Sequence, residues 1–310
     1  MSEIKLDWTP FLRSKAEETL NVQKQKSALE AKAARLRVKT MEMMSEANYG
    51  HPASSLGLAD LFAVLYFSGF LNISPNSPFS EERDRVVISN GHISAIVYTT
   101  LAEAGFISED YLKTYAKKGG LPGHLTRFSP PGVEITSGSL GQGVSIAVGM
   151  AVALKSRGRR VYLVTSDGEQ QEGQVWEAWQ AASKYNLSNL TVFIDCNGIQ
   201  NSGKTAEVMP VGNMTKKLKS FGFKVTECDG NDVLALCKAL DPIEETNMPK
   251  AFVLHTVPGK GVSFMENDPV WHGNLPSEIA RRAALRELKK KEREIKAWQT
   301  FLKEIGGKRQ

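Results

Sequence analysis

The sequence predicts a doubly wound α/β fold, with a mainly parallel sheet and helices on both of its faces. Short apolar segments alternate along the chain with longer segments rich in Ala, Leu, Lys and Glu. That alternation is typical of a parallel sheet covered on both sides. With 310 residues and 41% hydrophobic composition, the chain can bury a sizeable core in one large domain or two small ones.

The first part of the chain reads as a peripheral extension over residues 1–26, followed by a long helix over about 27–46. Gly50-His51-Pro52 interrupts the helical pattern, and a second helix begins at residue 54 and runs to 67. In chain order, the remaining predicted elements are a strand over 86–89, a glycine-rich loop region over 117–143, a helix over 142–155, a strand over 161–164, a helix over about 176–185, and strands over 191–194, 224–228 and 251–256. Residues 27–275 would form the main domain.

Residues 276–310 predict a basic amphipathic helix. From Ile279 to Gln310 there are eleven Lys or Arg residues and four Glu, a net charge of +7 that leaves the rest of the chain near −2. Apolar residues recur there at spacings of three, four and seven, at Leu285, Leu288, Ile295, Trp298, Leu302 and Ile305. Because one face is apolar, we expect this helix to pack on the body or on a partner chain, not to bind nucleic acid.

Composition and patterning favour a cytoplasmic enzyme or enzyme subunit. No signal-peptide pattern opens the chain, and the three cysteines lack the spacing of a disulfide framework. The longest apolar run, residues 56–71, contains Asp60 and two glycines, so it predicts a buried helix and not a membrane span. We therefore expect neither a membrane nor a nucleic-acid partner.

Asp167 and Asn197 are the most informative pair of residues. Each follows a short apolar strand, and the helix at 176–185 lies between the strands, which predicts a βαβ unit. Both side chains would then meet at the carboxyl ends of neighbouring parallel strands, where open α/β sheets bind ligands. A carboxylate with amide oxygens suits Mg²⁺, which takes a few hard protein oxygens and completes its shell with phosphate and water.

Histidine and glycine mark the other loops at that end of the sheet. Of the five histidines, four adjoin a glycine directly, namely His51, His92, His124 and His272. Histidines in such loops are commonly placed for chemistry, because loops at the end of a sheet line the site. The run from Thr136 to Gly143 contains three glycines and precedes a helix, but it matches neither a P-loop nor a dinucleotide fingerprint.

Together these motifs resemble the amino-terminal, diphosphate-binding half of a transketolase over about residues 27–275. The motifs that carry the resemblance are, in chain order, Gly50-His51-Pro52, Ser89-Asn90-Gly91-His92, Pro122-Gly123-His124, Thr136-Ser137-Gly138-Ser139-Leu140-Gly141-Gln142-Gly143, Asp167-Gly168, Glu172-Gly173, Asp195-Cys196-Asn197-Gly198-Ile199 and His272-Gly273. The resemblance implies a thiamine diphosphate-dependent transfer of a two-carbon ketol unit from a ketose phosphate to an aldose phosphate.

The resemblance also implies residue roles. The metal, Mg²⁺ with Ca²⁺ or Mn²⁺ as substitutes, would be held by Asp167, Asn197 and Ile199. The residues implied in cofactor binding are His51, His92, Gly138, Ser139, Leu140, Asp167, Gly168, Glu169, Asn197, Ile199 and His272. The residues implied in catalysis are His51, His124, His272 and Glu172, with Glu172 at a subunit interface. Histidines of near-neutral pKa would move protons to and from sugar hydroxyls.

Three departures from the family pattern qualify the expectation. Ser166 replaces the first glycine of the usual Gly-Asp-Gly, and Trp271-His272 stands where the family has two histidines. The chain also stops where a transketolase continues into its pyrimidine-binding domain. We therefore expect one subunit of a split enzyme, active with a separate chain in an α2β2 assembly. The substrate stays open among phosphorylated, branched and sulfonated sugars, since residues that read its anionic end would lie on that other chain.

Other classes remain as alternatives. The α subunit of a 2-oxo-acid dehydrogenase also carries a thiamine diphosphate motif on a separate chain. A 1-deoxyxylulose-phosphate synthase is normally one long chain. A non-catalytic regulatory module would keep the fold without the chemistry. The Ser89-Asn90-Gly91-His92 and Gly138–Gly143 motifs favour the transketolase.

Overall fold

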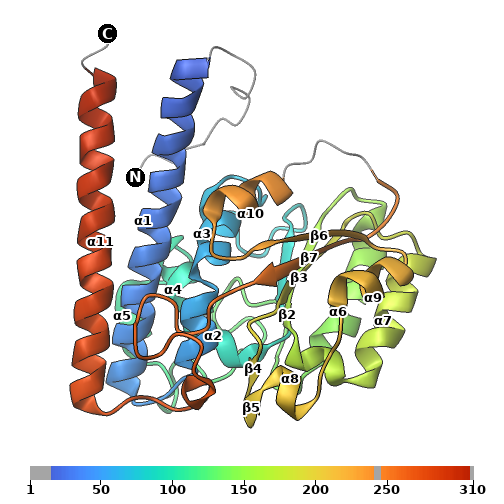
Figure 1. Ribbon diagram of the computed structural model, residues 1–310. Coiled ribbons are helices and arrows are strands. Elements are labelled where there is room, and N and C mark those ends of the chain that lie inside the picture. The colour runs from blue at the N-terminus through green and yellow to red at the C-terminus, as the bar shows by residue number, and fades with distance from the viewer. Residues whose placement is uncertain (1–14, 241–245, 308–310) are drawn as a thin grey trace.

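A five-stranded parallel sheet lies at the centre of the protein (Figure 1). The structure is a computed structural model that describes residues 15–240 and 246–307. The strand order is β1-β2-β3-β7-β6, and every pairing is parallel. The strands are β1 (Arg85–Ile88), β2 (Val161–Ser166), β3 (Leu190–Asp195), β6 (Lys224–Asp229) and β7 (Lys250–His255). The predicted doubly wound α/β fold is confirmed.

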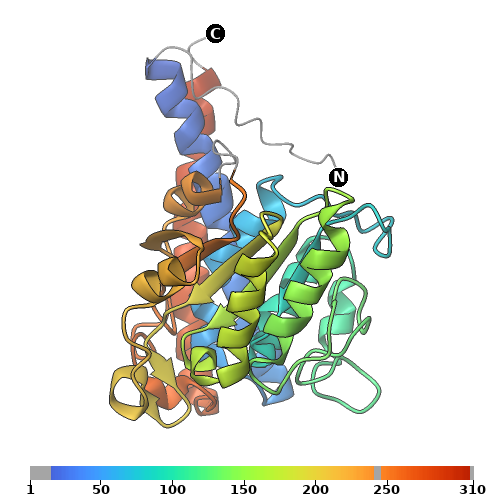
Figure 2. The same cartoon turned by 90° about the vertical axis from the view of Figure 1, so that its right-hand side faces the viewer.

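Helices cover both faces of the sheet, because alternate strand residues point to opposite sides. Val86, Tyr162 and Phe193 enter one buried cluster, whereas Val87 and Leu163 enter the other. The first cluster is completed by α1 (Lys15–Ala47), α3 (Ala59–Phe67), α4 (Ser94–Glu103) and α10 (Val233–Leu240). The second is completed by α6 (Gln142–Lys155), α7 (Gly173–Lys184) and α9 (Met214–Ser220). Figure 2 looks onto this second layer.

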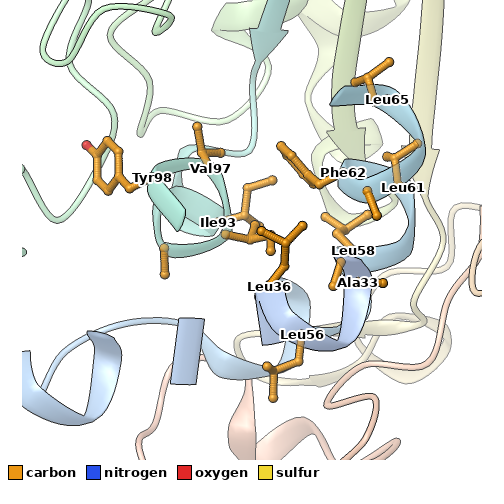
Figure 3. Close-up of a cluster of buried hydrophobic side chains, with 14 of the residues drawn as sticks. Ala33, Leu36, Leu56, Leu58, Leu61, Phe62, Leu65, Ile93, Val97 and Tyr98 are labelled. Carbon is orange, nitrogen blue, oxygen red and sulfur yellow. The ribbon is translucent and has the colours of Figure 1, made fainter. Parts of the chain in front are cut away.

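The larger core brings together helices that are far apart in sequence. Figure 3 shows Leu36 of α1, Leu56 of α2 (Pro52–Gly57), Phe62 of α3 and Val97 of α4 in one cluster. Leu36, Leu56 and Phe62 are fully buried. This packing fixes α2, the short helix that begins directly after His51, and so the core also positions His51.

Several boundaries differ from the sequence prediction. Helix α1 begins at Lys15, twelve residues before the predicted start, because residues 15–26 are themselves good helix formers. The apolar run 56–71 divides at Leu58 into two helices and ends as helix at Phe67. Residues 1–14 and 308–310 of the predicted terminal segments lie outside the described residues.

Short elements were missed because their periodicity is weak. They include a hairpin of β4 (Ile199–Gln200) and β5 (Gly203–Lys204), and the helices α5 (Glu109–Leu112) and α8 (Thr205–Val208). Helix α4 was also not predicted. The predicted loop region 117–143 contains no helix or strand before α6 begins at Gln142.

The C-terminal helix α11 (Glu278–Gly307) runs antiparallel to α1 along the side of the molecule (Figure 1). Arg281 donates to the Ser45 carbonyl and Gln299 to the Ser27 carbonyl, which fixes the direction of the pair. Leu288 and Leu302 are buried against the body. Leu288 and Leu302 of the predicted apolar face therefore pack as expected, whereas Trp298 of the same face is 48% exposed. None of the helices in the described ranges is both long and apolar enough to cross a membrane.

Glu103 ties α4 to α1. Its carboxylate accepts hydrogen bonds from Lys32, Arg35 and Lys39 at 2.7, 3.0 and 2.7 Å. Burial alone would raise the pKa of Glu103, but the ammonium groups of Lys32 and Lys39 outweigh it and lower the pKa to about 2. The folded pKa lies below the ordinary value of 4.5, so the ionised carboxylate stabilises the fold at neutral pH.

We expect Glu103→Gln to lower the free energy of unfolding by about 1–3 kcal/mol at pH 7. The deficit should shrink as the pH falls from about 4.5 towards 2, where the wild-type carboxylate loses its advantage. Urea unfolding at pH 7 and pH 3 measures the difference, with Glu177→Gln on the exposed face of α7 as the control. An equal deficit at both pH values would contradict the assignment.

Candidate functional site

Neighbouring strands bring Asp167 and Asn197 to one edge of the sheet, as predicted. Strands β2 and β3 pair in a register that sets Ser166 beside Asp195. The pairing continues one residue further, where the Asp167 N–H donates to the Asp195 carbonyl at 3.0 Å. The two side chains that follow the strands therefore emerge together at the carboxyl end of the sheet.

Asp167 is held in a nest of neutral donors. One carboxylate oxygen accepts from the Gly168 N–H at 2.7 Å, and the other accepts from the Gly198 N–H at 3.0 Å and the Thr205 hydroxyl at 3.2 Å. The side chain is buried, and burial raises its pKa to about 6 despite these hydrogen bonds. A nearby cation would restore the charged form.

Asp195 orients Asn197, a role that the sequence analysis missed. The Asn197 Nδ2 donates to Asp195 Oδ2 at 2.8 Å and to Ser54 Oγ at 3.4 Å, while its Oδ1 accepts from the Ile199 N–H at 3.0 Å. Thr256 donates to the other Asp195 oxygen. With its amide nitrogen held on the Asp195 side, Asn197 retains a second lone pair on Oδ1 that could bind a metal. A carboxylate at the end of a buried strand was the available sequence signal.

Four of the five histidines converge beside this edge. The ring centroids of His51 and His92 lie 5.3 Å apart, and His51 lies 5.9 Å from His124 and 6.0 Å from His272. His92 and His272 are 5.3 Å apart. Ser54, one turn into the helix that His51 precedes, links the cluster to Asn197. The fifth histidine, His255, is the exposed last residue of β7 and pairs instead with Glu227 of β6.

Three of these histidines are less basic than expected. Burial, followed by the proximity of His272 and His124, lowers the pKa of His51 to about 4. Burial and the neighbouring histidines lower the pKa of His92 well below its usual range, and burial lowers the pKa of His272. Charging one imidazole here costs desolvation and repulsion. At pH 7 these three imidazoles are therefore neutral, and each can both donate and accept a hydrogen bond.

The glycine-rich loop lies between the histidines and the start of α6. A Cβ at Gly138 would lie 3.6 Å from the ring of His124, so this part of the loop faces the cluster. Tyr49, also missed by the sequence analysis, contacts His124 Nδ1 at 3.3 Å through its hydroxyl. Gly141 has φ +83°, a left-handed conformation that turns the chain into α6 and favours glycine.

Glu169 and Glu172, two predicted site residues, lie in different surroundings. Glu169 was expected to bind cofactor, but it is fully buried and its carboxylate accepts from Ser89, Thr165 and the Gly141 N–H. The Glu169 side chain therefore points into the protein, and its predicted role in cofactor binding stays a prediction. Glu172 occupies the N-cap position of α7 and is exposed in this chain. Its position leaves it accessible to another protein chain, and its predicted role stays a prediction.

Comparisons with known proteins define the family. The sequence model described as "Transketolase, thiamine diphosphate binding domain" matches residues 28–288. An apulose-4-phosphate transketolase subunit from Actinobacillus succinogenes is 38% identical over 262 residues, which are 84% of this chain and 94% of that protein. The 6-deoxy-6-sulfo-D-fructose transketolase subunit SqwG of a Clostridium species is 35% identical, over 84% of this chain and 96% of its own. This chain belongs to the transketolase family.

Solved structures agree on the fold but are longer. A transketolase from Campylobacter jejuni superposes with a TM-score of 0.78 at 29% identity, covering 89% of this chain and 48% of its own. For a transketolase from Leishmania mexicana the TM-score is 0.75, with 46% of that chain covered. The chain therefore spans about half the length of the solved transketolases that it matches, and the resemblance to a diphosphate-binding half is confirmed.

Thiamine diphosphate fits the residues present. The Nδ1 atoms of His51 and His272 are buried with no hydrogen-bond partner among the described residues, which leaves them for a polar ligand. A Cβ at Gly168 would meet only the side chain of Gln200, at 3.7 Å, so the backbone beside Asp167 is open to a diphosphate. Hard oxygens from Asp167 and Asn197 could hold a divalent metal beside it.

The fit of α6 under the site yields a test of the packing. A Cβ at Gly143 would lie 2.7 Å from Ser89 Cα, whereas one at Gly149, two turns further on, would meet nothing within 4 Å. We expect Gly143→Ala to lower the free energy of unfolding by about 1–3 kcal/mol, because backbone must move. In the unassembled chain, Gly149→Ala should raise it by up to about 1 kcal/mol. Chemical unfolding of both variants measures this, and equal effects would refute it.

Proposed function

We propose that this chain is the amino-terminal subunit of a split transketolase. With thiamine diphosphate and Mg²⁺, or Ca²⁺ or Mn²⁺ in its place, it would transfer a two-carbon ketol unit to an aldose phosphate. The donor would be a ketose phosphate or a related anionic ketose such as a sulfosugar. One observation carries the proposal: Asp167, Asn197 and four histidines converge in a chain that spans half a transketolase.

The metal site in this proposal consists of the Asp167 carboxylate, the Asn197 amide oxygen and the Ile199 carbonyl. Gly168 and His92 would face the diphosphate, with Gly138, Ser139 and Leu140 along the cofactor. Bound thiamine diphosphate supplies the carbanion chemistry. His51, His124 and His272 would orient the sugar and hold protons at its hydroxyls. The anionic cofactor and substrate would raise the lowered pKa values of His51 and His272 towards the range useful in proton transfer.

Relatives support the two-chain organisation and bound the substrate. Two of them are named as subunits of an apulose-4-phosphate transketolase, and a third is named as a subunit of a 6-deoxy-6-sulfo-D-fructose transketolase. Apulose phosphate and a sulfonated hexulose differ from pentose phosphates at the end remote from the transferred carbons. We therefore keep branched, phosphorylated and sulfonated ketoses as donors. The family match weighs against two alternative enzymes, a 2-oxo-acid dehydrogenase subunit and a 1-deoxyxylulose-phosphate synthase. A regulatory module without chemistry would not need metal-dependent cofactor binding, so that binding distinguishes it from the proposed enzyme.

The proposed α2β2 assembly is supported by the outward face of α6. Ile146 and Val152 are 40% and 45% exposed, and no charged residue occurs from Gln142 to Leu154. The exposed residues are symmetric about Gly149: Ile146 and Val152 lie three residues either side of it, and Ser145 and Ala153 four. Two antiparallel copies crossing at Gly149 would therefore set Ile146 against Val152. Such self-complementarity is typical of a two-fold contact between identical chains.

The metal role of Asp167 has a direct test. In the complex with the pyrimidine-binding chain, we expect Asp167→Asn to weaken Mg²⁺-dependent thiamine diphosphate binding by at least about 100-fold, since loss of an outer-shell partner alone costs about 10–100-fold. Calorimetric titration measures the affinity. Asp110→Asn, at an exposed carboxylate, is the matched control. If Asp167→Asn bound thiamine diphosphate with unchanged affinity, the proposed metal site would be refuted.

The assembly has a separate test. We expect Ile146→Lys to weaken the two-fold contact by at least about 10-fold, or 1.4 kcal/mol, because a buried unpaired ammonium would result. Ile279→Lys, at a residue 80% exposed on α11, should leave the assembly unchanged. Analytical ultracentrifugation across a concentration series compares them. The same oligomer at every concentration for both variants would place the contact elsewhere.

A further inference from the structure

A buried carboxylate joins the three loops that line the proposed cofactor site. Glu169 belongs to the short turn after β2, and its side chain is 0% exposed. One of its oxygens accepts from the Ser89 hydroxyl and from the Gly141 N–H, the latter at 2.6 Å. The other accepts from the Thr165 hydroxyl at 2.5 Å. These partners lie after β1, at the start of α6 and in β2.

The loops that Glu169 joins pack so closely that an added Cβ at either of two glycines would clash. A Cβ at Gly143 would lie 2.6 Å from Ser89 Oγ, and one at Gly91 would lie 2.8 Å from the backbone carbonyl carbon of Ser137. Ser89 precedes the segment that carries His92, and Gly141 follows Leu140 of the glycine-rich loop. A shift of the Glu169 carboxylate would therefore move both segments relative to Asp167, which is only two residues away.

The donors to Glu169 are hydroxyls and a backbone amide, and none is a cation. A carboxylate kept for its charge would be expected beside Lys or Arg, or facing the ligand. Here the side chain spans a fixed distance and offers acceptors at both ends. This geometry suits a side chain that holds two loops at a fixed separation, and not one that transfers protons.

We infer that Glu169 is a positioning residue that sets the glycine-rich loop and the His92 segment in register with the metal-binding turn. It would act through Gly141 and Ser89, and it would not touch the cofactor. The inference rests on the proposed function, because it assigns Glu169 to the cofactor site of that enzyme. It replaces the expectation that Glu169 is itself a cofactor ligand.

Two conservative variants of Glu169 distinguish the effect of side-chain length from the effect of its negative charge. In Glu169→Gln the amide keeps the length of the side chain; its oxygen can accept from Gly141 and Ser89, and its NH₂ can donate to Thr165. In Glu169→Asp the charge remains, but the shorter side chain draws the oxygens back from Gly141. A positioning role predicts that Gln functions and Asp does not, whereas a role for the charge predicts the opposite.

The experiment uses the two-chain complex and titrates thiamine diphosphate with Mg²⁺ by calorimetry. We expect Glu169→Asp to raise the dissociation constant by about 10–100-fold and Glu169→Gln to stay within about threefold of wild type. Hydrogen exchange should be faster in the peptide containing Gly138–Gly143 in the Asp variant alone. Glu103→Ala, which loses the part-buried ion pairs between α4 and α1, controls for general loss of stability.

The outcomes distinguish the two claims. If the wild-type complex binds no thiamine diphosphate, the proposed function fails. If the wild type binds it and Glu169→Asp binds equally well, with unchanged exchange at Gly138–Gly143, the positioning role is refuted and the proposed function stands. If Glu169→Gln is the defective variant, the charge of Glu169 matters and the inference is wrong.

Discussion

The parallel pairing of β2 with β3 is the constraint on which the site depends. Because Ser166 lies beside Asp195, the residues after each strand leave the sheet at the same level. Asp167 then faces the loop that contains Asn197, and Gly198 donates to Asp167. A register shift of one residue would turn these side chains to opposite faces of the sheet. The hydrophobic layers on both faces enforce this register, so the core determines where Asp167 and Asn197 meet.

The site is built from buried neutral donors and uncharged imidazoles. Burial raises the pKa of Asp167 and, helped by the neighbouring Asp167 carboxyl, raises the pKa of Asp195, while the pKa values of His51 and His92 fall. These shifts share one cause, the cost of charge away from water. A divalent metal with a diphosphate would compensate that cost on both sides. In the chain alone these groups therefore bear a desolvation cost that a bound metal and diphosphate would offset.

Sequence patterns predicted the sheet, both layers and the meeting of Asp167 with Asn197, because strand ends and apolar alternation are local signals. The four histidines could be grouped by their glycine neighbours, but their mutual distances depend on packing between α2, α4 and the loops. Thr256 and Tyr49 were missed because they act from other segments of the chain, on Asp195 and His124. Asp195 lies only two residues before Asn197, but its contact with that side chain depends on side-chain direction. Glu169 lies two residues after Asp167 in sequence, but its carboxylate turns inward to Gly141. Side-chain direction in a short turn is set by tertiary contacts.

The most direct test of the central claim is a ketol-transfer assay with thiamine diphosphate and Mg²⁺. It compares this chain alone with the chain co-expressed with a pyrimidine-binding partner from the same genome. Xylulose 5-phosphate, apulose 4-phosphate and 6-deoxy-6-sulfofructose serve in turn as donors, and ribose 5-phosphate or glyceraldehyde 3-phosphate as acceptor. The account predicts turnover of at least one donor by the pair and none by the chain alone. Turnover by this chain unaided, or a pair that binds the cofactor and transfers no ketol unit from any of them, would contradict it.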